Sequence, residues 1–99
     1  MSQQVRSAIL PSPRSSVVLR EVHEGAILFC TRTEVYFALN STGVKIWRML
    51  PPTCAREEEI VSKLSEAFPE VNLGTISGDV RRLLDELLEN GLVELSRAA

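Results

Sequence analysis

The chain has 99 residues, a formal net charge of −2 and an apolar share of 44%, values typical of a single globular domain with a modest core. The acidic balance argues against a protein whose affinity comes from neutralising phosphates, which usually needs a clustered basic surface. No apolar run approaches the roughly 20 residues of a membrane-spanning helix, and the N-terminus lacks the pattern of a secretory signal. We therefore expect a cytoplasmic protein.

The first half of the chain predicts a short lead-in and then a small sheet. Residues 1–13 hold two prolines and no sustained periodicity, so we expect a flexible N-terminal segment there and a single domain over residues 14–96. Three segments rich in β-branched or aromatic residues follow, with hairpin-sized separations: Val17–Val22, Ala26–Cys30 and Glu34–Leu39. Their simplest arrangement is an antiparallel meander with the third strand at an edge.

The second half predicts three helices. The first begins at a cap formed by Ser41 or Thr42, places Trp47 as the central core anchor, and stops at Pro51-Pro52. The second covers about residues 55–68, and its acidic triplet from Glu57 to Glu59 suits a solvated helix start. The third covers about residues 75–90, with Asn90-Gly91 as its C-terminal stop. Its apolar arc comprises Ile76, Val80, Leu83, Leu84, Leu87 and Leu88.

Residues 92–95 can then return as a short apolar tail against the core. The predicted fold class is α+β, a winged helix-turn-helix-like domain in which a three-stranded antiparallel sheet is followed by three helices.

No residue pattern predicts catalysis. Cys30 and Cys54 lack a Cys-x-x-Cys spacing or a histidine partner, so we expect free thiols and no metal site. His23 is the only histidine, and its place in a strand turn favours an exposed residue over a general base. No glycine-rich phosphate loop occurs, so no cofactor is expected. The chain is predicted not to be an enzyme.

A DNA-reading role is disfavoured by the charge of the third helix. Between residues 75 and 90 two arginines stand against four carboxylates, which is the wrong sign for a phosphate-lined groove. Peptide binding by strand addition needs an open strand edge beside apolar pockets. The segment Glu34–Leu39 contains no proline or lysine that would blunt such an edge.

The run from Glu34 to Trp47 carries a family resemblance, because an alternating strand passes through Leu39-Asn40-x-x-Gly43 directly into a helix containing Ile46-Trp47. This junction resembles that of the PqqD-like family, also called RiPP recognition elements. The similarity extends from about residue 17 to residue 95. The further matching stretches are Glu59-Ile60-Val61-x-x-Leu64, Asp79-Val80-x-x-Leu83-Leu84-x-x-Leu87 and Gly91-Leu92-Val93.

The resemblance implies a function and a site. Members of the family bind precursor peptides by their leader segments, with the leader added antiparallel to the third strand and lying against the third helix. Carried onto this sequence, and with Arg81 added as a possible partner of a leader carboxylate, the expected peptide-binding residues are Glu34, Val35, Tyr36, Phe37, Ala38, Leu39, Ile76, Val80, Arg81, Leu84 and Leu88. Strand alternation puts Val35, Phe37 and Leu39 on one face, but the sequence does not decide which face meets the helices.

The Leu-Asn-x-x-Gly-x-x-Ile-Trp form is more similar to the stand-alone leader-binding proteins of lasso-peptide clusters than to the PQQ member. This similarity implies three partners: a precursor leader, a separate cysteine leader protease and an ATP-dependent cyclase. A non-catalytic adaptor would present the leader to the two enzymes. Two alternatives stay open. One is a PQQ-type precursor-peptide chaperone for a radical SAM enzyme, and the other is a homodimeric structural or regulatory winged-helix module.

Overall fold

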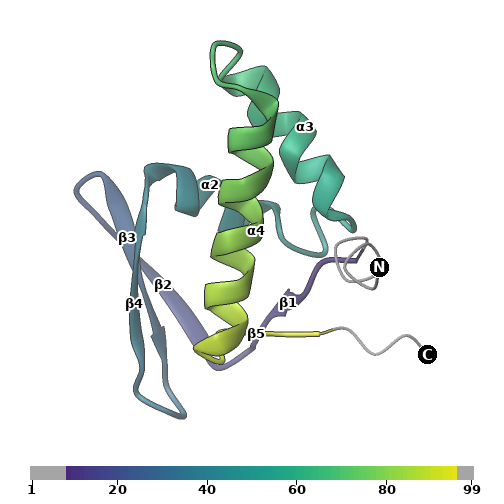
Figure 1. Cartoon of the computed structure of the whole chain (residues 1–99). Coiled ribbons are helices and arrows are strands. Elements are labelled where there is room, and N and C mark those ends of the chain that lie inside the picture. The colour runs from purple at the N-terminus through teal and green to yellow at the C-terminus, as the bar shows by residue number, and fades with distance from the viewer. Residues whose placement is uncertain (1–8, 96–99) are drawn as a thin grey trace.

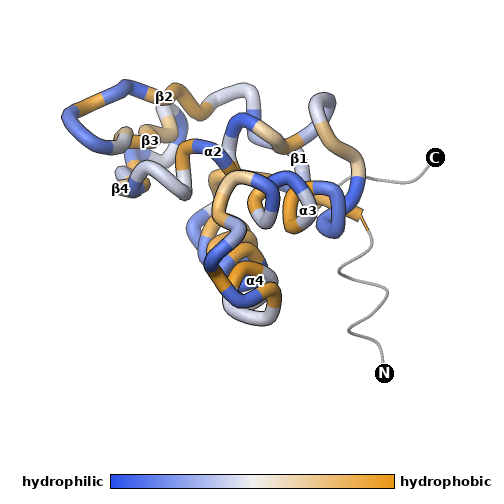
Figure 2. Tube along the Cα trace, turned by 90° about the horizontal axis from the view of Figure 1, so that it is seen from above, coloured by the Kyte–Doolittle hydropathy of each residue, from blue (hydrophilic) through white to orange (hydrophobic). Residues whose placement is uncertain are grey.

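The structure is a computed structural model, and it describes residues 9–95. One antiparallel sheet has the order β2-β3-β4 and comprises β2 (Val17–Val22), β3 (Gly25–Cys30) and β4 (Tyr36–Asn40). The helices that follow are α2 (Ser41–Met49), α3 (Glu57–Ala67) and α4 (Leu73–Glu89). Helix α4 lies across a layer made by the sheet, α2 and α3 (Figures 1 and 2). The α+β fold class predicted from the sequence is confirmed.

A second sheet of two short strands joins the ends of the domain. Strand β1 (Ser12–Pro13) pairs antiparallel with β5 (Val93–Glu94), and Arg14 Nη1 donates to Glu94 Oε1 at 3.2 Å. The sequence predicts a flexible segment over residues 1–13. Residues 1–8 lie outside the described part of the chain, but residues 9–13 correct this expectation because Leu10 is 1% exposed and belongs to the core. The folded domain therefore includes residues before 14.

The core forms where the inner face of the sheet meets the three helices. Along β3 the burial alternates, and Ala26, Leu28 and Cys30 are all buried, as expected for a strand with one face covered. The sequence prediction that Trp47 is the central anchor is wrong. Ile46 is 2% exposed, whereas Trp47 is only partly buried and packs against the edge of the core, because it lies about 100° further around α2.

Strand β4 runs into helix α2 without a loop. The predicted cap was Ser41 or Thr42, but the last strand residue, Asn40, takes this role: its Oδ1 accepts a hydrogen bond from Gly43 N at 2.8 Å. Asparagine is among the strongest N-cap residues because its short side chain reaches the free backbone N–H groups of the first turn. The cap fixes the direction in which α2 leaves the sheet and so sets the position of the β4 edge.

The sequence predicts that the acidic triplet at the start of α3 is solvated, but only part of it is exposed. Glu59 is exposed, and its Oε1 accepts hydrogen bonds from Ala55 N at 2.8 Å and Arg56 N at 3.1 Å. These backbone donors hold the pKa of the Glu59 carboxyl below its ordinary value. Glu57, by contrast, is 7% exposed. The triplet thus caps the helix through one carboxylate and buries another.

Helix α4 ends in a Schellman motif. Gly91 has φ +70°, its N–H donates to Leu88 O at 3.1 Å, and Leu92 N donates to Leu87 O at 3.0 Å. These bonds satisfy two carbonyl groups that a helix end would otherwise leave without partners. The motif turns the chain back, so that Leu92, 0% exposed, enters the core ahead of β5. The predicted return of residues 92–95 is confirmed for this buried part.

Replacing either of two glycines in this region with alanine should change stability in opposite directions. We expect Gly91→Ala to lower the free energy of unfolding by about 1 kcal/mol, because its φ is unfavourable for a residue with a Cβ. Gly78→Ala should raise it by about 0.5–1 kcal/mol, since Gly78 lies in the middle of α4 and an added Cβ would meet nothing within 4 Å. Urea denaturation measures both, and equal effects would contradict the Schellman assignment.

Candidate functional site

Strand β4 has one paired edge and one open edge. It pairs with β3 and is the last strand of its sheet. Cys30 N donates to Val35 O at 2.9 Å, and backbone groups alternate in direction along an antiparallel strand. The backbone groups of Phe37 and Leu39 therefore point to β3, and those of Tyr36 and Ala38 point to the open edge. The position at the edge is the one predicted from the sequence.

The side chains of β4 also divide between two faces. Leu39 is 5% exposed and Phe37 packs against the core, whereas Tyr36 is 70% exposed. The ring of Tyr36 lies against that of Phe29 on the outer face of the sheet, with centroids 4.6 Å apart. The face carrying Val35, Phe37 and Leu39 is thus the one that meets the helices, which answers the question that the sequence left open.

A groove of about 260 Å³ separates β4 from α4. Its strand wall includes Phe37 and Leu39, and Ile46 of α2 also lines it. The groove lies directly beside the open backbone edge, and in Figure 1 α4 runs alongside β4. A peptide strand added to β4 would direct alternate side chains into this groove, because cross-strand neighbours share a face.

The helix wall of the groove differs from the one predicted. Of the α4 residues expected to line it, Ile76 is 5% exposed, Val80 is 0% exposed and Leu84 is 5% exposed, so these side chains are core. Arg81 and Leu88 lie on the other side of α4, where they border a small pocket with residues that include Pro11 and Glu57. None of the five lines the groove between β4 and α4.

The residues that do form this wall are Asp79, Arg82, Leu83 and Glu86. They recur at i, i+3, i+4 and i+7, the spacing of one helical stripe. The sequence pattern does not single out this stripe, because the stripe borders the apolar arc and is mostly polar. Leu83, an arc residue omitted from the predicted site, was the available signal.

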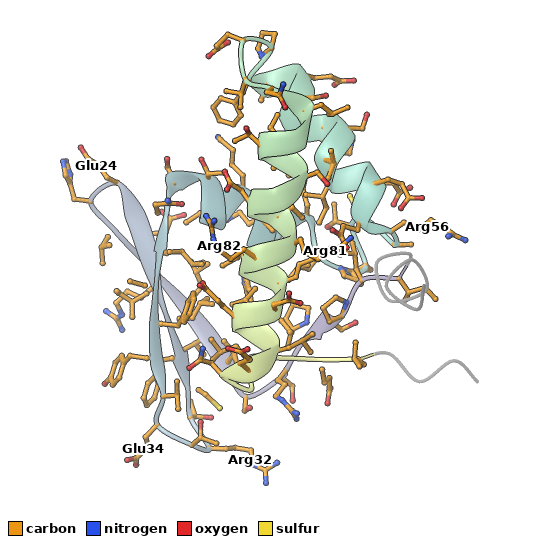
Figure 3. The ribbon with its side chains drawn as sticks, viewed as in Figure 1. Glu24, Arg32, Glu34, Arg56, Arg81 and Arg82 are labelled. Atoms are coloured by element: carbon orange, nitrogen blue, oxygen red, sulfur yellow. The ribbon has the colours of Figure 1, made fainter. Side chains whose placement is uncertain are left out.

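Two residues of the predicted strand, Glu34 and Val35, fall outside β4. Glu34 has φ +63° and its N–H donates to Cys30 O at 2.7 Å, so it closes the turn between β3 and β4. A residue in the left-handed region interrupts the extended backbone that strand pairing requires. Figure 3 places Glu34 at the tip of this turn. The open edge therefore begins at about residue 36.

Two neighbouring arginines of α4 have different surroundings. Arg81 Nε lies 3.2 Å from Glu57 Oε2, with the two side chains 39% and 9% exposed. Arg82 Nη2 lies 3.0 Å from Asp79 Oδ1, with both side chains at least half exposed. Figure 3 shows Arg82 on the β4 side of α4 and Arg81 on the opposite side. Arg81 thus ties α4 to the start of α3, and Arg82 belongs to the groove.

The two arginines should differ in their effect on stability. We expect Arg81→Gln to lower the free energy of unfolding by about 1–2 kcal/mol, because it leaves the nearly buried Glu57 carboxylate without its cation; partial exposure of Arg81 keeps the loss below that of a fully buried pair. The matched variant Arg82→Gln should change it by less than about 0.5 kcal/mol. Thermal and urea denaturation measure the difference, and equal losses would contradict this assignment.

Within residues 9–95, no group of three or more His, Cys, Asp or Glu side chains could hold a metal ion. Both cysteines are buried and free. In the same part of the chain, no helix is both long and apolar enough to cross a membrane.

Comparisons with known proteins identify the family of this chain. No curated protein matches the chain. A solved structure described as TbiB1 in complex with the TbiA(beta) leader peptide has a TM-score of 0.75 and 28% sequence identity, and the match covers 88% of this chain and 99% of that one. A family model described as coenzyme PQQ synthesis protein D matches residues 25–93, from β3 through β5. The chain therefore belongs to the PqqD family, whose members are RiPP recognition elements.

Proposed function

We propose that this protein binds the leader segment of a ribosomally synthesised precursor peptide of the lasso-peptide class by adding it as a strand to β4. The observation that carries the proposal is the open edge at Tyr36 and Ala38 beside a groove with an apolar strand wall. An edge strand supplies backbone donors and acceptors, and pockets for alternate side chains supply specificity. The similarity to a protein solved in complex with a leader peptide supports the same reading.

The proposed binding mode predicts which leader residues matter. Residues opposite Tyr36 and Ala38 exchange backbone hydrogen bonds with β4, and their side chains lie on the outer face of the sheet. Residues opposite Phe37 and Leu39 place their side chains in the groove. Leader residues of the second kind should be apolar where they meet Leu39 and Leu83.

In this proposal the protein raises the effective concentration of the precursor at the enzymes that process it. An adaptor that holds the leader and contacts a separate cysteine leader protease converts cleavage into a nearly intramolecular event. The same holds for an ATP-dependent cyclase acting on the remaining peptide. In this proposal the chain contributes no catalytic residue, and loss of the groove would be observed as loss of the enzymes' activity.

The similarity to coenzyme PQQ synthesis protein D favours a second candidate. In that case the same groove holds a precursor peptide for a radical SAM enzyme rather than for a protease. The two candidates share the peptide-binding step and differ in the enzyme that receives the peptide. Reconstitution with each class of enzyme separates them.

Anisotropy titration tests the peptide-binding step. The labelled probes are the leader of a precursor encoded beside this chain's gene and the TbiA(beta) leader, each with a scrambled control. We expect saturable binding in the micromolar range or tighter for the first leader and none for its scramble. Absence of binding at about 100 µM protein, together with concentration-dependent size in gel filtration, would instead support a homodimer formed through the same edge.

A further inference from the structure

The groove between β4 and α4 has an electronegative end. Its helix wall carries three ionised side chains, Asp79, Arg82 and Glu86. The Arg82 guanidinium is held by the Asp79 carboxylate at 3.0 Å, so the one cation of this wall is already paired within α4. Among residues 9–95, no cationic nitrogen lies within 4.0 Å of the Glu86 carboxylate. The groove wall is left with a net charge of −1, located at Glu86.

A second feature adds to this negative potential. Glu86 lies in the last turn but one of α4, and the final turn of this helix contains no basic residue. The C-terminal end of a helix carries a partial negative charge, which lysine or arginine side chains usually offset. Here Glu86 and Glu89 occupy the last two turns instead. The helix dipole and the side chains therefore have the same sign at this end.

The position of this end relative to β4 follows from the fold. Helix α4 runs antiparallel to β4, so that its C-terminus lies beside the start of the strand (Figure 1). Glu86 therefore faces the part of the groove near Phe37 rather than the part near Asn40. The turn before β4 carries Arg32 and Glu34, one charge of each sign, and neither lines the groove.

We infer that the groove selects a leader with a basic side chain, lysine or arginine, at the groove-facing position nearest the start of β4, where it pairs with Glu86. This inference rests on the proposed function and specifies the chemistry of its ligand. The remaining groove-facing positions take apolar side chains against Leu39 and Leu83. Glu86 is then a specificity-determining residue with no role in the stability of the core, because it is exposed.

The test is an mRNA-display selection of random 15-residue peptides on the purified protein. Enriched peptides are kept only if they fail to bind the Ala38→Pro variant, which lacks one donor at the open edge. We expect alternating apolar residues with lysine or arginine enriched at one position. Replacing this basic residue with alanine should weaken binding to the wild-type protein about fivefold, the effect of a partly exposed ion pair.

Charge variants of the protein distinguish an ion pair between Glu86 and the peptide from a general effect of the protein's net charge. When the protein carries Glu86→Gln, replacing the basic residue of the peptide with alanine should change the affinity for that variant by less than about twofold. Glu66→Gln, which alters the net charge equally on the exposed part of α3, should retain the fivefold effect. Enriched peptides without a basic preference, or a fivefold effect that persists in Glu86→Gln, would overturn the inference and leave the proposed function standing. Failure to obtain any peptide that depends on the β4 edge would overturn both.

Discussion

Replacing Ala38 with proline should reduce peptide affinity at least about tenfold without unfolding the domain. The N–H of Ala38 points to the open edge, so proline removes a hydrogen bond to the added strand and places its ring where the peptide backbone would lie. The bonds between β4 and β3 remain, since they involve Phe37 and Leu39. Proline is tolerated on edge strands when the lost N–H faces solvent. Anisotropy titration measures the affinity, and thermal denaturation verifies the fold.

Two further proline variants make this result specific. Glu21 lies in β2 at the other edge of the sheet, opposite Ala26 of β3, and alternation points its N–H away from β3. Glu21→Pro should therefore leave peptide affinity unchanged. It should lower the stability of the domain only slightly, because the ion pair between Glu21 and Arg48 that it removes is exposed. Phe37→Pro should destabilise the domain by about 3 kcal/mol or more, because it breaks the ladder to Leu28. Equal peptide affinity in Ala38→Pro and Glu21→Pro would argue against strand addition at β4.

The largest loss of stability is expected for Leu84→Asp. Leu84 is 5% exposed within the core of the domain, so the substitution removes apolar contacts and buries a carboxylate with no partner in the core. We expect a loss of about 4 kcal/mol or more, close to the whole stability of a small domain. Loss of the cooperative thermal transition and of near-ultraviolet circular dichroism measures it.

Leu83 is the matched position on the groove side of the same helix. It is partly buried and lines the groove, so Leu83→Gln should keep a cooperative transition while weakening peptide binding by about fivefold, the loss of roughly 1 kcal/mol of apolar contact. If Leu84→Asp folds but binds the peptide more weakly, and Leu83→Gln binds it unchanged, the result would favour the binding residues predicted from the sequence over the groove wall.

The contrast between Leu83 and Leu84 shows which features of the fold can be predicted from the sequence and which cannot. Local patterns predicted the three strands of the larger sheet and the three helices, and the hairpin-sized separations predicted that the strand Glu34–Leu39 occupies an edge. The same patterns cannot state how a helix is rotated about its axis within the fold. Since a residue step turns the side chain by about 100°, a shift of one position along α4 exchanges a core face for a groove wall.

The two-residue strand β1 was missed for another reason. Ser12 and Pro13 have no strand propensity of their own and pair with residues 93 and 94, about 80 positions away along the chain. Such pairing depends on the direction that the chain takes after the Schellman turn at Gly91. The residues around Ser12 and Pro13 hold no information about that direction. The buried Leu10 also depends on a distant segment, because its N–H donates to Ala55 O at 3.1 Å.

The pairing of β1 with β5 also determines how the protein can be attached to other molecules. Residues 9 and 95 border one small pocket together with Leu88, on the side of α4 away from the β4 groove, and Figure 1 shows both strands there. A tag, dye or fused enzyme attached at residue 9 or 95 would thus lie on the side of α4 away from the groove that we propose as the peptide site. A label at either position should leave the groove accessible to a soluble peptide.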